Sequence, residues 1–400
     1  MMQHPNALFL NHNEITALAK KHSTPFYVYS SDVLTYYAQQ SLLFSGPYGT
    51  TVRYAVKANP HKKIIQLFDS LGLHFDASSG GEVALLMSHG VQPSHIALNS
   101  QELPINVKEL VTAGVLFTAT SLHQLETYCT QFPGGRIGVR LNPGVGSGES
   151  NKVTTGGKSA GFGIWHEYIP KVKAIAAEHN VTIDTLHTHI GAGTDPIIWQ
   201  QVAKITLGLA EQIQTVTTVS LGGGFKVARM ADESSADVPK IGEAIATLLK
   251  DFANRTHRQL HIEIEPGTYL TALSGLLVAS VIDITDTGAD GFTFLRINTG
   301  MNDILRPSLY GAQHPIWLIP QKTTDEAMKK YVIIGHNCES GDVLTPEKGN
   351  PEALAPRSLS RASIGDIVVI GGAGAYCASM RAHGYNSYAS AKEVYIETNN

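Results

Sequence analysis

The chain alternates short apolar runs with helix-like stretches eight times, and this rhythm constrains its fold more than any other feature. Each run is rich in β-branched or aromatic residues and ends in Gly, Asn, Ser or Pro. The stretches between the runs carry apolar residues at i, i+3 and i+4 spacing, which is typical of amphipathic helices. Strands that alternate with helices predict parallel βαβ units. The eight runs are TVRYAVKAN (51–59), LHFDASS (73–79), HIALNS (95–100), LFTATS (116–121), RIGVRLNPG (136–144), DTLHTHIGAG (184–193), TVSLGGG (218–224) and LHIEIEPG (260–267).

Eight such units within about 240 residues predict a closed (β/α)₈ TIM-type barrel. The alternative is an open doubly wound sheet, but no G-x-G-x-x-G motif follows the first run. After residue 270 strand-like runs follow one another without helices, which predicts an all-β second domain. The run PFYVYS (25–30) precedes the barrel, and we expect it to pair with the C-terminal sheet. We therefore predict a barrel over 31–270 and a β-sandwich or barrel-like domain from 1–30 and 271–400.

Composition limits the class of partner. Lys and Arg total 30 against 34 Asp and Glu, a net charge of −4 without a basic run, so neither nucleic acid nor an anionic membrane is expected. The three cysteines, Cys129, Cys338 and Cys377, are too few and too scattered for a disulfide framework, which favours a reducing cytoplasm. The N-terminal segment lacks the pattern of a signal peptide, and no 18-residue apolar run follows. We expect a soluble cytoplasmic protein with a small-molecule partner.

Most of the notable polar residues follow a predicted strand, which is where barrel enzymes place their catalytic groups. Lys57 ends the first run, YAVKAN, and an isolated ammonium is costly to bury. Such a lysine can be structural, if it forms a salt bridge or if its side chain extends to water. Alternatively, it is a nucleophile in catalysis. The other polar residues and glycines at strand ends are Ser79, Glu82, Asn99, Arg140, Asn142, His187, His189, Gly222, Gly223, Gly224 and Glu265.

The glycines Gly222–Gly224 follow the seventh strand, a frequent phosphate site in barrels. Their backbone N–H groups can approach an anion without a Cβ in the way, although a tight β–α turn is the simpler alternative. With Lys57 as the Schiff-base lysine and Glu265 as the carboxylate that keeps the ring nitrogen protonated, they fit pyridoxal 5′-phosphate. His189 is either a core histidine or a group that stacks on the cofactor ring. No metal site is expected.

Several segments resemble the signature segments of the alanine-racemase-fold (fold type III) pyridoxal-phosphate-dependent decarboxylases. The resemblance covers about residues 25–390, and LRPSLYGAQH combined with CESGD is more specific than any single segment. It implies a barrel plus a β-domain in an obligate homodimer whose active sites are shared between protomers. The segments are YAVKAN, FDASSGGE, RLNPG, HTHIGAG, SLGGGF, EIEPG, LRPSLYGAQH, CESGD and GAYCASM.

Carried over by matching positions, the resemblance implies a complete cofactor site. Lys57 would be the Schiff-base lysine, His189 would stack on the ring, and Glu265 would pair with the pyridine nitrogen. Gly222–Gly224 and Tyr376 would hold the phosphate.

The resemblance also implies how the substrate is bound. Cys338 would return a proton to the substrate, and Glu339 would bind its distal ammonium. Arg306 and Tyr310 would bind its distal carboxylate, for which arginine suits a bidentate contact. Tyr376 would also border the substrate. Cys338 and Glu339 are expected to reach the active site of the partner protomer.

One position departs from the family pattern. Thr268, in EPGTYL, replaces an arginine that helps to bind the phosphate or the substrate carboxylate, and losing a charge-assisted hydrogen bond of roughly 1.5 to 3 kcal/mol should matter. Either another group such as Lys158 substitutes, or the substrate lacks the distal carboxylate. Because Arg306 is retained, we expect decarboxylation of meso-2,6-diaminopimelate to L-lysine and CO₂, a step of lysine biosynthesis.

The sequence allows two other interpretations of the function. A decarboxylase of a basic amino acid, D- or L-lysine or ornithine, is the alternative that Thr268 leaves open. A cofactor carrier or an inactive homologue is disfavoured by the β-rich C-terminal part and by the presence of both Lys57 and Cys338.

Overall fold

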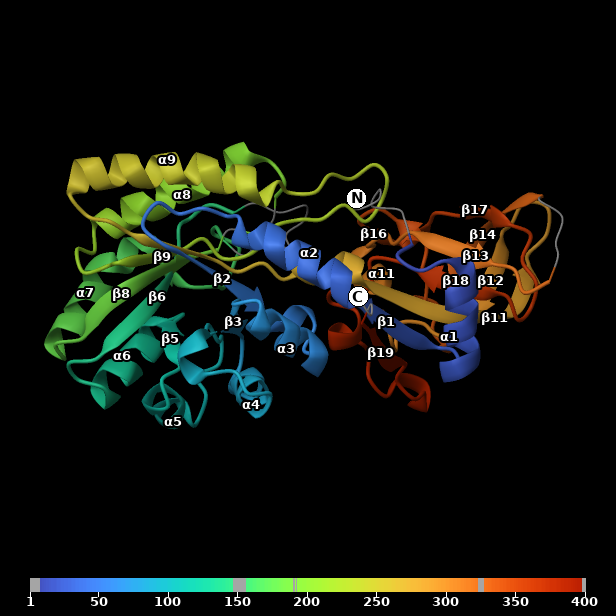
Figure 1. The fold of residues 1–400 in the computed structure, drawn as a ribbon, viewed down its shortest axis with the longest axis horizontal. Helices are drawn as coiled ribbons and strands as arrows, with labels where there is room; N and C mark the ends of the chain where they lie inside the picture. The colour runs from blue at the N-terminus through green and yellow to red at the C-terminus, as the bar shows by residue number, and fades with distance from the viewer. Residues whose placement is uncertain (1–7, 147–155, 190, 192, 323–326, 398–400) are drawn as a thin grey trace. The chain divides into compact units, whose positions relative to one another are not determined.

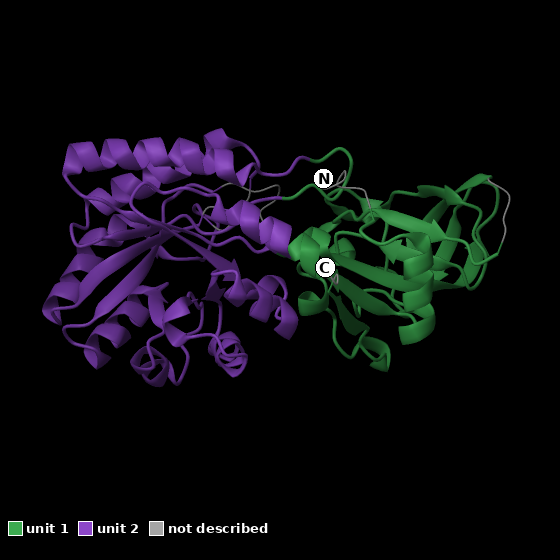
Figure 2. Ribbon diagram, viewed as in Figure 1, with its two compact units in different colours: residues 1–34, 227–233, 271–400 green, residues 35–226, 234–270 purple. Residues whose placement is uncertain are grey.

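The computed structural model describes residues 8–146, 156–189, 191, 193–322 and 327–397. The chain forms two compact units, each made of more than one segment (Figure 2). Unit 1 comprises Met1–Leu34, Val227–Glu233 and Thr271–Asn400, and unit 2 comprises Thr35–Lys226 and Ser234–Leu270.

Unit 2 is a closed barrel of eight parallel strands, so the predicted fold class is confirmed. Strand pairing runs from β5 through β4, β3, β2, β10, β9, β8 and β6, and then returns to β5. Each of the eight apolar runs supplies one strand. The strands are β2 (Thr50–Ala55), β3 (His74–Ala77), β4 (Ile96–Leu98), β5 (Leu116–Ala119), β6 (Arg136–Asn142), β8 (Thr182–Thr188), β9 (Thr218–Ser220) and β10 (His261–Ile264), and β7 (Ile164–Trp165) adds to the edge of β6.

Amphipathic helices surround these strands (Figure 1). In α3 (Lys62–Ser70) the apolar spacing buries Ile64, Ile65 and Phe68 against the barrel. The long helix α9 (Val238–Thr256) begins where Asp237 accepts a hydrogen bond from the backbone N–H of Lys240. The other helices between strands are α4 (Gly80–Ser88), α5 (Val107–Thr112), α6 (Leu122–Gln131), α7 (Ile169–Glu178) and α8 (Pro196–Glu211).

Unit 1 is built on a mostly antiparallel sheet, as the strand-like runs after residue 270 predict. Its N-terminal strand β1 (Phe26–Ser30) pairs with β11 (Gly275–Asp286) on one side and with β19 (Lys392–Ile396) on the other. Residues from both ends of the chain therefore share one sheet. The other strands of this sheet are β12 (Thr293–Ile297), β13 (Ile316–Ile319), β14 (Met328–Ile334), β17 (Arg357–Ser360) and β18 (Ile367–Ile370). The strands β15 (Pro346–Glu347) and β16 (Asn350–Leu354) pair with each other in a separate two-stranded sheet.

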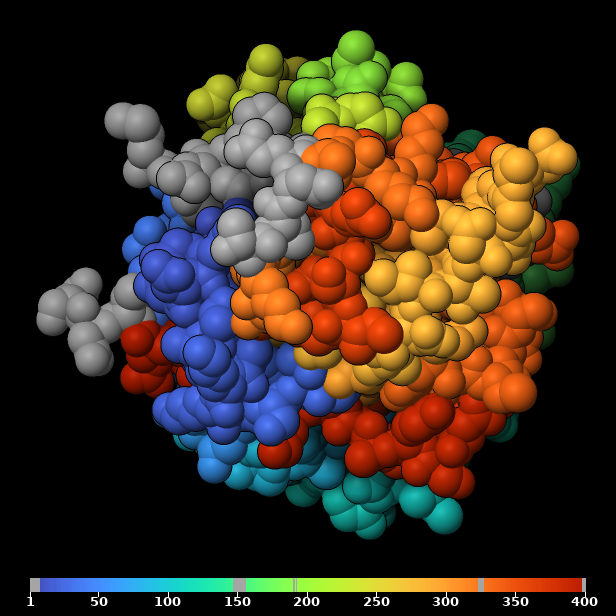
Figure 3. Space-filling view, turned by 90° about the vertical axis from the view of Figure 1, so that its right-hand side faces the viewer, coloured from blue at the N-terminus to red at the C-terminus, as the bar shows by residue number. Residues whose placement is uncertain are grey.

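Helix α1 (His12–His22) closes the core of unit 1. Its residue Ile15 is fully buried in a cluster with Phe26, Val28, Val278 and other aliphatic residues of the sheet. Figure 3 shows the blue N-terminal residues beside the orange and red strands of the same unit. The short helix α11 (Arg306–Tyr310) also belongs to unit 1, whereas α2 (Ser31–Leu42) and α10 (Thr268–Thr271) contain points where the chain passes between units.

The structure adds two features that the sequence pattern does not reveal. The segment Val227–Glu233, which follows the seventh barrel strand, belongs to unit 1. Lys57 lies in a 3₁₀ turn, Val56–Ala58, and not in the strand that precedes it. In the described part of the chain, no helix is long and apolar enough to cross a membrane.

Candidate active site

Lys57 lies just past the carboxyl end of β2, in the 3₁₀ turn Val56–Ala58. Its side chain is 49% exposed, so it is not the buried ammonium that its apolar surroundings suggest. Lys57 Nζ donates a 3.2 Å hydrogen bond to Ser78 Oγ and lies 4.0 Å from Asp76 Oδ2. The amine therefore contacts one group within the neighbouring strand β3, Asp76, and one that follows it, Ser78.

Asp76 is a functional candidate that the sequence reasoning missed. It is buried at the end of β3, and Asn99 Nδ2 donates a 2.7 Å hydrogen bond to its Oδ1. Burial and then the charge of Glu265 raise the pKa of Asp76 to about 6, while Lys57 opposes the rise. An aspartate in an otherwise apolar strand, FDA, was the signal available in the sequence.

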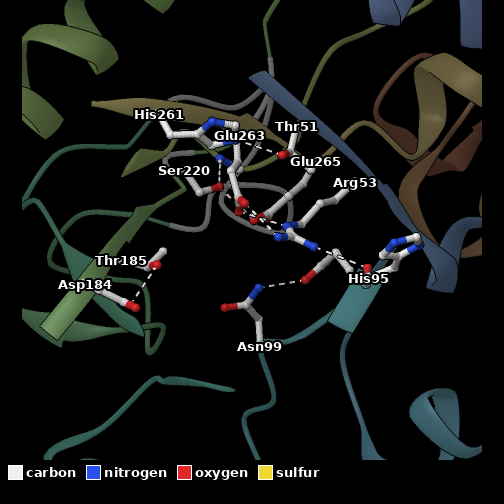
Figure 4. Close-up of polar contacts among 12 residues, drawn as sticks. Thr51, Arg53, His95, Asn99, Asp184, Thr185, Ser220, His261, Glu263 and Glu265 are labelled. Carbon is white, nitrogen blue, oxygen red and sulfur yellow. Dashed lines mark hydrogen bonds and ion pairs between the residues drawn. The ribbon is translucent and has the colours of Figure 1, made fainter. Parts of the chain in front are cut away.

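Glu265 follows β10 and is held as an anion by two donors. Ser220 Oγ donates to Glu265 Oε1 at 2.7 Å, and His187 Nε2 donates to Oε2 at 3.0 Å. Burial alone would raise the pKa of Glu265, but the charge and hydrogen bond of His187 and the hydrogen bond of Ser220 outweigh burial and lower it. Figure 4 shows Ser220 and Glu265 close together. The site thus contains a buried, ionised carboxylate.

Close packing explains why glycines follow β9. Gly222 has a φ of +69°, and a Cβ there would come within 2.8 Å of the Cβ and Cγ of His189. A Cβ on Gly223 would collide with the backbone carbonyl of Glu265. Since the N–H groups of Gly223 and Gly224 meet no protein acceptor among the described residues, they remain available to an anion.

His189 is partly buried beside this turn, and its Nδ1 atom is fully buried. Burial, and then the charge of Arg140, keep the pKa of His189 well below its ordinary value of 6.5. A neutral imidazole offers a flat ring face without the cost of a buried charge.

Other polar residues at the strand ends have structural roles. Asn142 accepts hydrogen bonds from the backbone N–H groups of Gly144 and Gly157, and its amide donates to the carbonyls of Gly157 and Ala160. Ser79 caps α4 by accepting from the N–H of Glu82. These contacts stabilise loops, and they indicate a structural role for Asn142 and Ser79.

A buried ion pair lies within the barrel strands near these groups (Figure 4). Arg53 Nε donates to Glu263 Oε2 at 2.8 Å, and Arg53 Nη2 donates to Glu263 Oε1 at 2.7 Å. The fork geometry fixes β2 against β10, the two strands that lead to Lys57 and Glu265.

This end of the barrel fits pyridoxal phosphate in three respects. Lys57 supplies an accessible amine, the N–H groups of Gly223 and Gly224 suit a phosphate, and Glu265 suits a protonated ring nitrogen. The donors and charges needed for the cofactor are therefore present in unit 2.

The candidate substrate residues lie in unit 1, two of them on the turn that contains CESGD. Asp342 holds this turn, because its Oδ1 accepts from Met301 N at 2.7 Å and its Oδ2 accepts from Asn337 N at 3.0 Å. Cys338 and Glu339 follow on the exposed side of the turn.

The remaining candidates lie elsewhere in unit 1. Arg306 opens α11, with its guanidinium carbon 5.9 Å from the centroid of the Tyr310 ring. Tyr376 has a φ of +55°, which is uncommon for a bulky residue and often occurs at functional positions.

Comparison with known proteins agrees with this arrangement. Residues 37–272 match the family model of the pyridoxal-dependent decarboxylases, in their pyridoxal binding domain. Diaminopimelate decarboxylase from Buchnera aphidicola subsp. Schizaphis graminum is 30% identical, covering 98% of this chain and 93% of the relative.

Solved structures also resemble this chain over nearly its whole length. A crystal structure of diaminopimelate decarboxylase has a TM-score of 0.91 at 26% identity, covering 100% of this chain and 95% of the other. The Helicobacter pylori diaminopimelate decarboxylase complexed with L-lysine has a TM-score of 0.83 at 26% identity, covering 97% and 95%. The chain therefore belongs to the pyridoxal-dependent decarboxylase family, and within it to the group of the diaminopimelate decarboxylases.

Proposed function

We propose that the enzyme uses pyridoxal phosphate to decarboxylate meso-2,6-diaminopimelate, releasing L-lysine and CO₂ in lysine biosynthesis. The observation that carries this proposal is the pairing of an accessible Lys57 with a buried, ionised Glu265 at one end of the barrel. When bound, the cofactor supplies the electron sink that loss of CO₂ from an amino acid requires. The similarity to diaminopimelate decarboxylases supports the choice of substrate.

The residues of unit 2 would bind and tune the cofactor. Lys57 would bond to the cofactor aldehyde, and Gly222–Gly224 would hold the phosphate with Tyr376 of unit 1. Glu265 would keep the ring nitrogen protonated, because its two donors stabilise the carboxylate as an anion. His189 would lie against the ring as a neutral imidazole, which places no competing cation beside the protonated nitrogen.

The residues of unit 1 would recognise the substrate and return a proton. Cys338 would deliver the proton to Cα after CO₂ has left, and Glu339 would bind the distal ammonium. Arg306 and Tyr310 would bind the distal carboxylate, and Tyr376 would border the substrate. We further propose a cytoplasmic homodimer in which Cys338 and Glu339 complete the partner's site. Their exposure on unit 1 is compatible with that role.

The threonine at position 268 favours a second candidate function. A chain without the usual arginine there could decarboxylate D- or L-lysine or ornithine, whose distal group is an ammonium. CO₂ release measured side by side on meso-diaminopimelate, both lysines and both ornithines separates the two functions. We expect diaminopimelate to be turned over fastest, and a clear preference for lysine or ornithine would establish the alternative.

The role of Lys57 is tested by absorbance. The purified wild-type enzyme should be yellow, and Lys57→Ala should lose both the visible band and decarboxylase activity. Ser78→Ala is a matched control, because it removes only the hydrogen bond to Lys57 Nζ and should keep the band. Full activity of Lys57→Ala without added amine would exclude the assignment.

A further inference from the structure

Three arginine side chains of unit 1 carry buried N–H groups that no acceptor among the described residues satisfies. Arg229 lies on the segment Val227–Glu233, Arg306 opens α11, and Arg357 begins β17. The buried atoms without a partner are Nη2 of Arg229, Nε of Arg306, and Nε and Nη2 of Arg357. In the part of the chain that the structure describes, no carboxylate forms an ion pair with any of these three side chains. Buried N–H groups of a guanidinium without an acceptor are suited to an anionic ligand, and Arg229 is the most buried of the three side chains.

Arg229 is held in one orientation. It is only 8% exposed, and its Nε donates a 3.0 Å hydrogen bond to the carbonyl of Gly372. Gly372 has a φ of +60°, and a Cβ there would come within 3.0 Å of the Arg229 side chain. The backbone N–H of Arg229 donates to Glu233 Oε2 at 2.8 Å, which fixes the segment itself. One edge of the guanidinium is thus bound to protein, and Nη2 remains for a ligand.

A second arginine, Arg306, acts on Arg229 through its charge. Burial, and then the charge of Arg306, lower the pKa of Arg229 to about 9. His314 Nδ1 donates to the carbonyl of Gly371 at 2.8 Å, and burial followed by the charges of Arg229 and Arg306 lowers its pKa well below 6.5. A neutral His314 adds no charge of either sign. The Glu233 carboxylate, which accepts from the Arg229 backbone N–H, favours the Arg229 cation but forms no ion pair with its guanidinium. Among the described residues no acceptor meets Arg229 Nη2 or Arg306 Nε, so these two groups are suited to an acidic ligand.

We propose that Arg229 binds the distal carboxylate of the substrate together with Arg306, and so supplies the second guanidinium that Thr268 cannot. This inference rests on the proposed function, because only a substrate such as diaminopimelate carries that carboxylate. Two guanidinium groups can share the four lone-pair sites of one carboxylate. Lys158, the other candidate, lies exposed on a barrel loop. The cofactor phosphate is a second possible anion, and the experiment below separates the two.

L-lysine and cadaverine are the probes, since they differ only in the carboxylate that would occupy this cluster. Dissociation constants for both are measured by calorimetry on wild-type holoenzyme, Arg229→Met and Arg229→Lys. The wild type should prefer L-lysine. Arg229→Met should reduce that preference roughly tenfold or more, with little change for cadaverine. Arg229→Lys, which keeps the charge and a donor for Gly372, should show an intermediate loss.

A matched control and a second variant distinguish a specific effect of Arg229 from a general loss of structure. Arg296→Met removes a partly buried arginine of the same unit, paired with Asp283, and should leave the preference unchanged. Gly372→Ala keeps Arg229 but displaces its side chain, and should also reduce the preference. Thermal unfolding and the affinity for pyridoxal phosphate are recorded for every variant.

Three outcomes would overturn the inference. If folded Arg229 variants keep the preference for L-lysine while the wild type decarboxylates diaminopimelate, Arg229 has no such role and the proposed function stands. If the variants lose affinity for pyridoxal phosphate and keep the preference, the anion is the cofactor phosphate. If the wild type itself binds cadaverine as tightly as L-lysine, the proposed substrate is wrong, and the role of Arg229 is excluded with it.

Discussion

The side chain of Asn386 holds the backbone of Cys338: Asn386 Oδ1 accepts a 2.7 Å hydrogen bond from the Cys338 N–H. The preceding residue, Tyr385, donates from its hydroxyl to Glu339 Oε2 at 3.1 Å. Gly384 and Asn386 both have positive φ, +78° and +49°, so the turn adopts a backbone shape that few residues tolerate. Two adjacent residues of one turn therefore position the two adjacent residues to which we assign proton return and ammonium binding.

The first prediction concerns this turn. Asn386→Ala should lower kcat about tenfold, because Cys338 would lose a fixed position, while the visible absorbance of the cofactor should not change. Tyr385→Phe should mainly raise KM for diaminopimelate through Glu339. Steady-state kinetics and absorbance spectra measure both effects. Ser390→Ala, which breaks an exposed hydrogen bond to His383 nearby, is the control. An unchanged kcat in Asn386→Ala would show that this turn has no positioning role.

Much of the fold follows from periodicity. The eight barrel strands and the helices between them could be predicted because each is local, with apolar spacing of either two or about 3.6 residues. The strands β13 and β17 are harder to predict from the sequence pattern. They are four residues each, and tertiary pairing decides whether such short segments become strands.

The site could be predicted only where a residue type is distinctive in its local context. Lys57 and Glu265 are charged residues that end apolar runs, and the glycines after β9 are consecutive. Asp342 and Arg229 are different, because their importance depends on contacts with residues far away in sequence. A buried donor without an acceptor is visible only in three dimensions.

The second prediction tests the shared active site. Lys57→Ala and Cys338→Ala should each be inactive. Mixing them should restore activity, because one of the two sites in a heterodimer would contain both wild-type residues. Subunit exchange is verified first with differently tagged chains. Activity no higher than in either parent would mean that each protomer builds its own site.

The third prediction concerns the buried pair of Arg53 and Glu263, whose side chains are 3% and 10% exposed. Glu263→Ala should lower the free energy of unfolding by about 3 kcal/mol or more, because Arg53 would lose its bidentate partner in the barrel interior. The double variant Arg53→Met/Glu263→Leu should lose less. Urea denaturation measures both, and a double variant as unstable as Glu263→Ala would contradict the argument.

The fourth prediction is a pH dependence that arises from Asp76, whose pKa is affected by burial and by the charges of Glu265, Lys57 and His187. Its pKa is raised from 3.8 to about 6 in the folded protein, so the folded state binds this proton more tightly than the unfolded state. The stabilisation that Asp76 contributes is therefore complete below pH 4 and is lost as the pH rises through 6. Asp76→Asn cannot ionise, so its stability relative to wild type should increase by roughly 2 to 3 kcal/mol over that interval. Urea denaturation of the cofactor-free enzyme between pH 4 and 7.5 measures the difference, and a constant difference would contradict the assignment.

The last prediction concerns Thr268, on which the choice of substrate depends. If diaminopimelate is the substrate, Thr268→Arg should increase its kcat/KM, because the new guanidinium can bind the distal carboxylate. An interaction of about 1.5 kcal/mol corresponds to roughly tenfold in kcat/KM.

The gain should be larger in the Arg229→Met background than in the wild type, since Arg229 already supplies a second guanidinium there. If the natural substrate carries only a distal ammonium, the new arginine should instead repel it and reduce lysine or ornithine turnover by a similar factor. Arg306→Ala completes the test. If Arg306→Ala no longer turns over diaminopimelate, the distal carboxylate is bound by Arg306. If Arg306→Ala keeps nearly full activity, and the wild type turns over lysine or ornithine faster than diaminopimelate, the enzyme is a decarboxylase of basic amino acids.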